Sequence, residues 1–342
     1  MEKVLISLDQ GNSKTDIVIV SCSGCIVARE CYVYECIDFD FERWAIIKEI
    51  VVRLLSSINA TLCDVEYLLA AVCGADREED NVRIQQILSE ILGISNNRIT
   101  IVNDSQAALR AGMPFQAGPG NYAVVYAGTM FNCTLLSHSG KKYTYGHLVN
   151  GCDNGSFAMG RLAWETVIDS YNGFCDSTIM ESIFLNHYGS KSISSLSTDF
   201  YSNKKTFSPC SFSKLLFTAV EHNDIVATEI MSKFAHRWAM YVVNGLSKIC
   251  ISVDENIDVV LAGGIFKNCS DLWLDLIKSE IREYCPNAFC SLSSVEPVVG
   301  AVLLLLEKIN RGTLSAEIIH NVKKSKLYKQ LQIKIKAESE KL

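Results

Sequence analysis

The segment SLDQGNSKTDIVIV, residues 7–20, places a turn between two apolar runs and decides how the start of the chain is interpreted. A plain hairpin turn needs only a glycine or an asparagine. This turn region also contains a serine, a lysine, a threonine and two aspartates. Backbone N–H groups in turns of small residues can approach phosphate oxygens closely. Two interpretations follow: a hairpin turn rich in hydrogen-bonding groups, or a turn that binds an anion.

The composition describes a chain large enough for two packed cores. It has 342 residues, 49% of them hydrophobic, a mean hydropathy of +0.16 and a net charge of −6. The negative charge argues against broad nucleic-acid binding, because phosphate backbones require a positive face. No basic segment followed by an apolar block opens the chain, and no apolar run has membrane-spanning length. We therefore expect a cytoplasmic protein with no nucleic-acid or membrane partner.

The cysteines predict neither a disulfide framework nor a metal centre. There are fourteen, and Cys22 and Cys25 in CSGC form the close pair. Zinc sites usually need two such pairs or nearby histidines. CSGC is therefore either a hairpin turn with Ser23 and Gly24 at its tip, which we favour, or a metal or redox pair. We expect the other cysteines to be small buried apolar residues.

Two rounds of strands and helices follow one another along the chain. In the first round the periodicity predicts three strands over residues 3–35, a helix over 41–58, and two further strands alternating with helices up to residue 112. The motif GPG at residues 118–120 begins the second round, where residues 121–146 predict another three-stranded meander. The repetition indicates two α/β lobes of similar design.

The second round continues with helices over most of residues 155–251. A serine-rich stretch at 190–213 interrupts them and is either a lid or a surface insertion. A strand with a glycine turn follows at 257–268, and a late helix begins near residue 296.

Two such rounds predict a ligand cleft between the lobes, because turns at strand ends converge there. We expect a small lobe formed by residues 1–118 together with 296–342, whose helix returns to it. The large lobe is expected to comprise residues 119–295.

Eight short motifs carry the functional prediction. In chain order they are DQGNSKTD (9–16), CGADREED (73–80), VNDSQAAL (102–109), AGTMFNC (127–133), GHLVNGCDNGS (146–156), EHNDIVATEIM (221–231), LAGGIFKN (261–268) and EPVVGAVLLL (296–305). Together they resemble the N-acetylglucosamine kinase and benzoyl-CoA reductase ATPase branch of the sugar kinase, actin and heat-shock chaperone superfamily. The resemblance covers nearly the whole chain and implies two actin-like, ribonuclease H-like lobes.

The resemblance also implies that ATP and Mg²⁺ bind in the cleft. DQGNSKTD and AGTMFNC correspond to two phosphate turns, and LAGGIFKN to the adenosine motif. Asp9 would orient the metal ion and its waters, since magnesium keeps several waters and takes few carboxylates. The nucleotide-binding residues implied are Asp9, Gly11, Asn12, Ser13, Lys14, Thr15, Thr129, Asn132, Gly263, Gly264 and Asn268.

Asp104 has two possible roles. It stands between a strand and a helix, where Asn103 or Asp104 can cap the helix, and spacing alone favours capping. The resemblance instead implies that Asp104 is the general base that takes the proton of an attacking sugar hydroxyl.

The glycine-rich loop at 146–156 is either a loop of turn-forming residues or the sugar-binding loop that the resemblance implies. Carboxylates and amides suit polyols because each can bridge adjacent hydroxyls. The acceptor-binding residues implied are Asp38, Asp104, Thr129, Gly146, His147 and Asp153.

Some positions depart from the family pattern. Met130 and Phe131 stand where small residues are usual, and Gln10 and Asn12 where glycines are frequent. Asp38 is the nearest polar counterpart of an asparagine that amino-sugar kinases present.

Three functions fit the resemblance. The first is ATP-dependent phosphorylation of an amino sugar such as N-acetylglucosamine or glucosamine. The second is an ATPase activator of a 2-hydroxyacyl-CoA dehydratase or benzoyl-CoA reductase system, which ranks lower because the cysteines are scattered. The third is a catalytically weak relative that senses a sugar or nucleotide. The partner is expected to be a small sugar, and a homodimer stays open.

Overall fold

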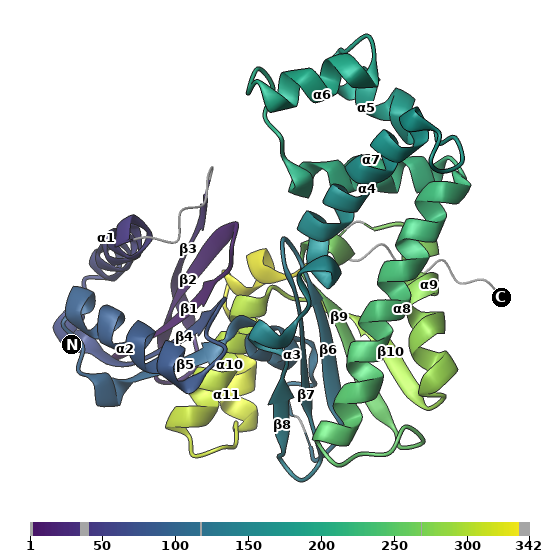
Figure 1. Ribbon diagram of the computed structural model, residues 1–342. Coiled ribbons are helices and arrows are strands. Elements are labelled where there is room, and N and C mark those ends of the chain that lie inside the picture. Colours follow the sequence, from purple (N-terminus) through teal and green to yellow (C-terminus); the bar gives the residue numbers. More distant parts are fainter. Residues whose placement is uncertain (1–2, 35–40, 117, 268, 335–342) are drawn as a thin grey trace.

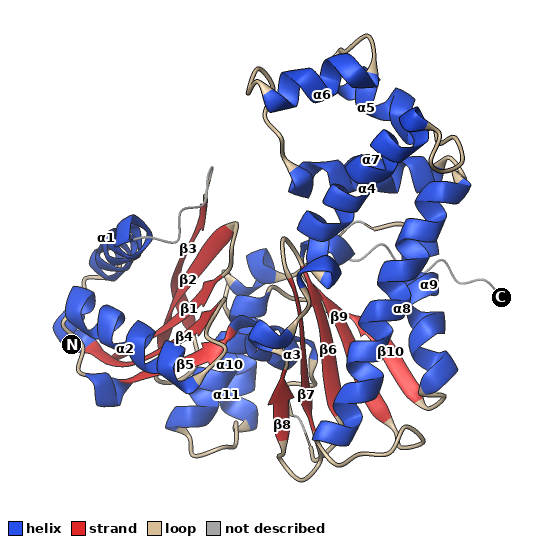
Figure 2. Cartoon of the chain, in the orientation of Figure 1, coloured by secondary structure: helices blue, strands red, loops and turns tan. Residues whose placement is uncertain are grey.

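The computed structural model describes residues 3–34, 41–116, 118–267 and 269–334. It contains two five-stranded sheets that lie side by side, each with helices packed against it (Figure 1). Colouring by secondary structure shows that further helices lie between the two sheets (Figure 2).

The first sheet has the order β3-β2-β1-β4-β5. β1, β2 and β3 form an antiparallel meander, and β4 and β5 add parallel strands beside β1. The turn between β1 and β2 lies within the segment SLDQGNSKTDIVIV. The strands are β1 (Val4–Gln10), β2 (Lys14–Ser21), β3 (Ile26–Val33), β4 (Val65–Val72) and β5 (Ile99–Asn103).

The second sheet repeats this topology. Its order is β10-β9-β6-β7-β8, in which β6, β7 and β8 form the meander and β9 and β10 are the parallel strands. The predicted two-lobe α/β fold with a repeated meander is confirmed. The strands are β6 (Tyr122–Ala127), β7 (Phe131–Leu136), β8 (Lys142–Thr144), β9 (Ile257–Ala262) and β10 (Ala288–Leu292).

The helices divide between the two sheets. α1 (Phe41–Ser57) and α2 (Glu78–Leu92) share one apolar cluster with the first sheet. Helices after β8 build most of the second lobe, and α5 and α6 stand away from both sheets at the top of Figure 1. The second-lobe helices are α4 (Gly155–Asn172), α5 (Met180–Tyr188), α6 (Ile193–Tyr201), α7 (Pro209–Glu221), α8 (Ile225–Lys248) and α9 (Asp271–Tyr284).

The serine-rich stretch is part of this helical region. It contains α6 and the start of α7, whose apolar residues Leu196, Phe200 and Phe212 belong to the core of the second lobe. The stretch is therefore a packed helical insertion. Helix α9 and strand β10 were not predicted from the sequence.

Two helices fill the space between the sheets. α3 (Asp104–Gly112) packs against the second sheet through Leu109 and Val260. α10 (Pro297–Ile309) packs on the first sheet and on α3. The chain therefore crosses back to the first lobe after β10, and α11 (Ala316–Lys324) follows on the same side. This packing supports our proposed division into residues 1–118 with 296–342 and residues 119–295.

The cysteine prediction is partly wrong. CSGC forms the favoured hairpin turn, in which Gly24 has a φ of +95° and its N–H donates to Ser21 O. Cys133, Cys285 and Cys290 are buried, but several other cysteines are exposed, because they lie in loops or on outward faces. The exposed cysteines are Cys31, Cys63, Cys152, Cys175 and Cys250.

Within the described ranges no cysteine forms a disulfide bond. Over the same residues no helix combines the length and apolarity that crossing a bilayer requires.

We expect Gly300→Ala to destabilise the protein by about 1–3 kcal/mol, because overpacking of a closed contact has this cost. A Cβ at Gly300 would lie 1.8 Å from Ala107 O and 2.6 Å from Ala111 N, so α3 and α10 would have to separate. Urea denaturation measures the effect. Gly118→Ala is the control, since a Cβ there meets nothing within 4 Å. Equal stability of both variants would contradict this close helix contact.

Candidate functional site

A cavity of about 840 Å³ lies between the lobes and is lined by both of them. It contains most of the residues predicted from the motifs, although these are spread over more than 250 positions of the sequence. The predicted residues that line it are Asp9, Gly11, Asn12, Ser13, Lys14, Asp104, Thr129, Asn132, Gly146, His147, Gly263 and Gly264.

Four predicted residues are not among those lining the cavity. Asp38 and Asn268 lie outside the described residues. Thr15 is buried, and its hydroxyl is hydrogen-bonded to that of Tyr34. Asp153 belongs to the glycine-rich loop, and its side chain is buried.

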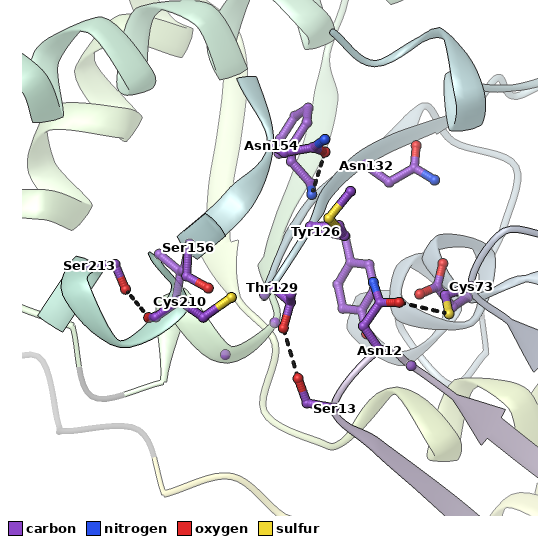
Figure 3. A pocket seen from close by; sticks show the side chains of 18 of the residues that line it. Asn12, Ser13, Cys73, Tyr126, Thr129, Asn132, Asn154, Ser156, Cys210 and Ser213 are labelled. Atoms are coloured by element: carbon purple, nitrogen blue, oxygen red, sulfur yellow. Dashed lines mark hydrogen bonds between the residues drawn. The ribbon is translucent and has the colours of Figure 1, made fainter. Parts of the chain in front are cut away.

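The two predicted phosphate turns meet in the cleft. Ser13, between β1 and β2, and Thr129, between β6 and β7, are joined by a hydrogen bond of 2.8 Å between their hydroxyls (Figure 3). Each turn is closed by one backbone bond: Gly11 N to Lys14 O and Gly128 N to Met130 O, both 2.9 Å. Corresponding turns of the two lobes therefore face the same cavity.

Two glycines allow the chain to pack tightly around the second turn. Ser156 N, at the start of α4, donates to Gly128 O at 2.7 Å, and a Cβ at Gly155 would lie 2.2 Å from that oxygen. Gly263, after β9, has a φ of +102°, and a Cβ there would lie 2.3 Å from Ala127 O. Glycine is required at both places, because backbone approaches backbone.

The two bulky residues of the second turn point in different directions. The Phe131 ring is buried and stacks on Trp238, with 4.9 Å between ring centroids. Met130 is 43% exposed and lines the cavity. The Phe131 side chain, which departs from the family pattern, therefore packs in the core.

Asp9 carries a buried carboxylate with an unpartnered oxygen. It is the last residue but one of β1, with 3% exposure, and Oδ1 has no hydrogen-bond partner among the described residues. Burial raises the pKa of Asp9 well above its usual value, while Lys14 acts in the opposite direction. A bound cation would supply the missing partner and favour the ionised form. The site therefore fits a magnesium ion held through Asp9 and its waters.

Two charged residues that the sequence analysis did not single out lie beside this turn. Glu296, which precedes α10, accepts from Lys14 Nζ at 2.9 Å and from Lys267 Nζ at 2.6 and 2.7 Å. Burial opposes ionisation of Glu296, but the two lysines lower its pKa overall. Both residues stand inside quoted motifs, EPVVGAVLLL and LAGGIFKN. The ion pairs join three segments that are far apart in the sequence, so no local sequence pattern predicts them.

The structure separates the two roles considered for Asp104. Asn103 is the N-cap of α3, because its side-chain oxygen accepts from Ser105 N at 3.0 Å. Asp104 is the first helical residue, is buried, and lines the cavity. Burial raises the pKa of Asp104 to about 7. Capping therefore belongs to Asn103, and the Asp104 carboxyl is left to act in the cavity.

Asp153 anchors the glycine-rich loop to α8. Its carboxylate accepts from Arg237 Nε at 3.0 Å, from Arg237 Nη2 at 2.6 Å and from the Tyr241 hydroxyl at 2.8 Å. Trp238 Nε1 donates to the backbone oxygen of Asp153 at 2.8 Å. Burial opposes ionisation, but these bonds lower the pKa of Asp153 overall. Direct contact with a sugar would require Asp153 to exchange these partners.

A second group of lining residues comes from α7 and had no sequence signal. These residues lie on a helix within and after the serine-rich stretch, and their spacing of three and four is typical of any helix face. They are Cys210, Ser213, Lys214, Phe217, Thr218 and Glu221.

Two α/β lobes of one topology, with paired turns and buried carboxylates in the cleft between them, define a two-lobed ATPase or kinase type of fold. The BadF/BadG/BcrA/BcrD ATPase family model matches residues 6–304, and the chain belongs to this family. It is 25% identical over 323 residues to an N-acetyl-D-glucosamine kinase of Dictyostelium discoideum, covering 89% of this chain and 98% of that protein.

Solved structures confirm the actin-like fold. The putative N-acetylglucosamine kinase of Chromobacterium violaceum matches with a TM-score of 0.62 at 14% identity, covering 89% of this chain and 99% of that one. The ROK family glucokinase of Streptomyces griseus, solved with glucose and AMPPNP, matches with a TM-score of 0.58 at 16% identity over 88% and 98% of the chains.

We expect Arg237→Met to lower the free energy of unfolding by about 1–3 kcal/mol, since it removes charge-assisted hydrogen bonds to a buried carboxylate. Arg161→Met is the matched control, because its pair with Glu165 is exposed and spaced i,i+4. That control should change the stability by less than about 0.5 kcal/mol. Chemical denaturation at pH 7 compares them, and equal losses would contradict an anchoring role for Asp153.

Proposed function

We propose that this chain is an ATP-dependent kinase that phosphorylates a hydroxyl group of an amino sugar such as N-acetylglucosamine or glucosamine. The observation that carries the proposal is the Asp104 carboxyl, buried in the same cavity as the two phosphate turns. Family membership and the Dictyostelium relative support the activity and the substrate class.

Phosphoryl transfer is mainly positioning and charge stabilisation, so the protein has little covalent work to do. In the proposed complex, the N–H groups of Asn12 and Ser13 in the first turn and of Thr129 and Met130 in the second would contact the phosphates of ATP. Lys14 and Lys267 line the same cavity and offset negative charge. Gly263 and Gly264 directly follow β9, in the segment that resembles the adenosine motif. Magnesium bound near Asp9 would screen the phosphate oxygens.

Asp104 is the proposed general base. A base works best when its pKa lies near the operating pH, and burial gives Asp104 such a pKa. The carboxylate would take the proton of the acceptor hydroxyl while its oxygen attacks the γ-phosphorus. The bond from that phosphorus to the β–γ bridging oxygen would break, and ADP would leave. The acceptor would lie between Asp104, Thr129 and the loop residues Gly146 and His147, which all line the cavity.

The direct test is phosphate transfer from ATP with N-acetylglucosamine, glucosamine and glucose as acceptors, measured as sugar-dependent ADP release. Transfer should need magnesium and should stop with EDTA. ADP release that is unaffected by any sugar would overturn the kinase proposal. The activator alternative ranks lower, because the cysteines are scattered along the sequence. The homodimer stays a prediction.

We expect Asp104→Asn to lower turnover by about 100- to 10,000-fold, because it removes the proton acceptor. Folding should be preserved, since Asn103 makes the cap and the amide carries no buried charge. Steady-state kinetics and a thermal melt on the same preparation measure both effects. Asn103→Ala is the contrasting variant, which should lose stability because it removes the cap. Turnover of Asp104→Asn within a few-fold of wild type would end the general-base assignment.

The pH profile gives an independent check. The base must be ionised, so kcat/KM should rise with pH and level off above about 7, the raised pKa of Asp104. Because the folded chain binds this proton more tightly than the unfolded chain, the same group makes stability fall as pH rises from about 4 to 7. The residual activity of Asp104→Asn should not show this rise of kcat/KM with pH. An unchanged rise in that variant would assign it to another group.

A further inference from the structure

Asp76 is a charged cavity residue with no role so far. It follows β4 in the first lobe and lines the cavity together with Asp104. It is half-buried, and burial raises the pKa of its carboxyl. Gly146 of the glycine-rich loop lies against it from the second lobe, since a Cβ on Gly146 would be 2.7 Å from Asp76 Cγ. Asp76 therefore stands where the two lobes meet around the proposed acceptor.

A chain of amides connects Asp76 to that loop. Gly146 N donates to Asn132 Oδ1 at 3.0 Å, Asn132 Nδ2 donates to Asn103 Oδ1 at 3.0 Å, and Asn103 Nδ2 donates to Asp76 Oδ1 at 2.7 Å. Asn103 and Asn132 are buried. An ionised carboxylate only accepts hydrogen bonds, so Asp76 fixes the orientation of both amides. The chain passes through Asn103, which directly precedes Asp104 in the sequence.

One carboxylate oxygen of Asp76 remains available. Oδ1 is used by Asn103, whereas Oδ2 has no hydrogen-bond partner among the residues that the structure describes. Asp76 is also close enough to Asp104 for its charge to raise the pKa of that group, after the larger effect of burial. Asp76 and Asp104 therefore present two carboxylates to one end of the cavity, held by different elements.

We propose that Asp76 binds the acceptor: its Oδ2 accepts a hydrogen bond from a sugar hydroxyl other than the one that Asp104 deprotonates. This inference rests on the proposed kinase function and adds a specificity-determining residue to it. Carboxylates suit this role because they accept strong hydrogen bonds from hydroxyl groups. A site built around such a bond discriminates strongly against an analogue that lacks the hydroxyl.

The same geometry restricts the substrate class. A sugar acid or a sugar phosphate bound here would place an anion beside Asp76 and Asp104, where like charges repel. An uncharged sugar or a protonated amino sugar meets no such repulsion. The acceptor inferred from these contacts is a neutral or cationic sugar with at least two free hydroxyls on the side facing the first lobe.

The experiment pairs a change in the protein with a change in the sugar. Wild type and Asp76→Asn are titrated with N-acetylglucosamine and its 3-, 4- and 6-deoxy analogues in a calorimeter. Asparagine can still accept from Asn103, so the amide chain is kept while the charge is lost. Asp76→Asn should weaken N-acetylglucosamine binding by about 10- to 100-fold. In wild type, one deoxy analogue should bind about 10- to 100-fold more weakly than N-acetylglucosamine. In Asp76→Asn, the same analogue should bind less than about threefold more weakly than N-acetylglucosamine.

Asp80→Asn is the matched control, because Asp80 lies four residues after Asp76, in the first turn of α2, and is paired with Arg77 outside the cavity. Its sugar affinities should equal those of wild type. In steady-state assays Asp76→Asn should raise the KM for the sugar and leave the KM for ATP within about twofold, since the phosphate turns are elsewhere.

If removing each hydroxyl costs the same affinity in wild type and in Asp76→Asn, the inference is overturned. Asp76 would then serve only as the hydrogen-bond partner of Asn103. An unchanged affinity of Asp76→Asn for N-acetylglucosamine would also overturn the inference. The proposed function fails by a different result, namely no transfer of phosphate by wild type to any sugar.

Discussion

The close crossing of α3 and α10 is the constraint on which the rest of the structure depends. Both helices lie between the sheets, and Gly300 lets their backbones approach where any side chain would collide with Ala107 O. α3 begins at Asp104, and α10 begins after Glu296. One helix contact therefore fixes the spacing between the proposed general base, the lysine-binding carboxylate and the two turns. The cavity exists because each sheet packs on its own side of this helix pair.

Charge is distributed unevenly around the cavity. Asp9 and Asp104 are buried at strand ends, and burial raises the pKa of both. Glu296 is instead kept ionised by two lysines. The surroundings therefore raise the pKa of some carboxyl groups in the cavity and lower that of another. This is typical of sites where one group moves a proton and another holds a cation.

Local patterns predicted much of the fold. The meander at 3–35 and its repetition at 121–146 are visible because turns with small residues separate apolar runs, and most of the motifs lie at strand ends that face the cleft. Long-range pairing was not predictable: Glu296 meets Lys14 only after the chain returns to the first lobe. Asp153 looked like a ligand residue in its loop, yet Arg237 and Tyr241, more than eighty positions later, occupy its carboxylate. Asn103 and Asp104 were equal candidates for the cap until backbone geometry distinguished them.

The return of α10 to the first sheet also bears on how the chain folds during its synthesis. Leu5, Val18 and Leu69 on that sheet are buried against Val298 and Val302 of α10. The ribosome makes these two groups more than two hundred residues apart, so this face of the first sheet has no native cover until α10 has been made. The second lobe is contiguous and can form its own core earlier. The segment that completes the first lobe is thus made after the whole second lobe, and a chain interrupted before it would expose an apolar surface to chaperones and proteases.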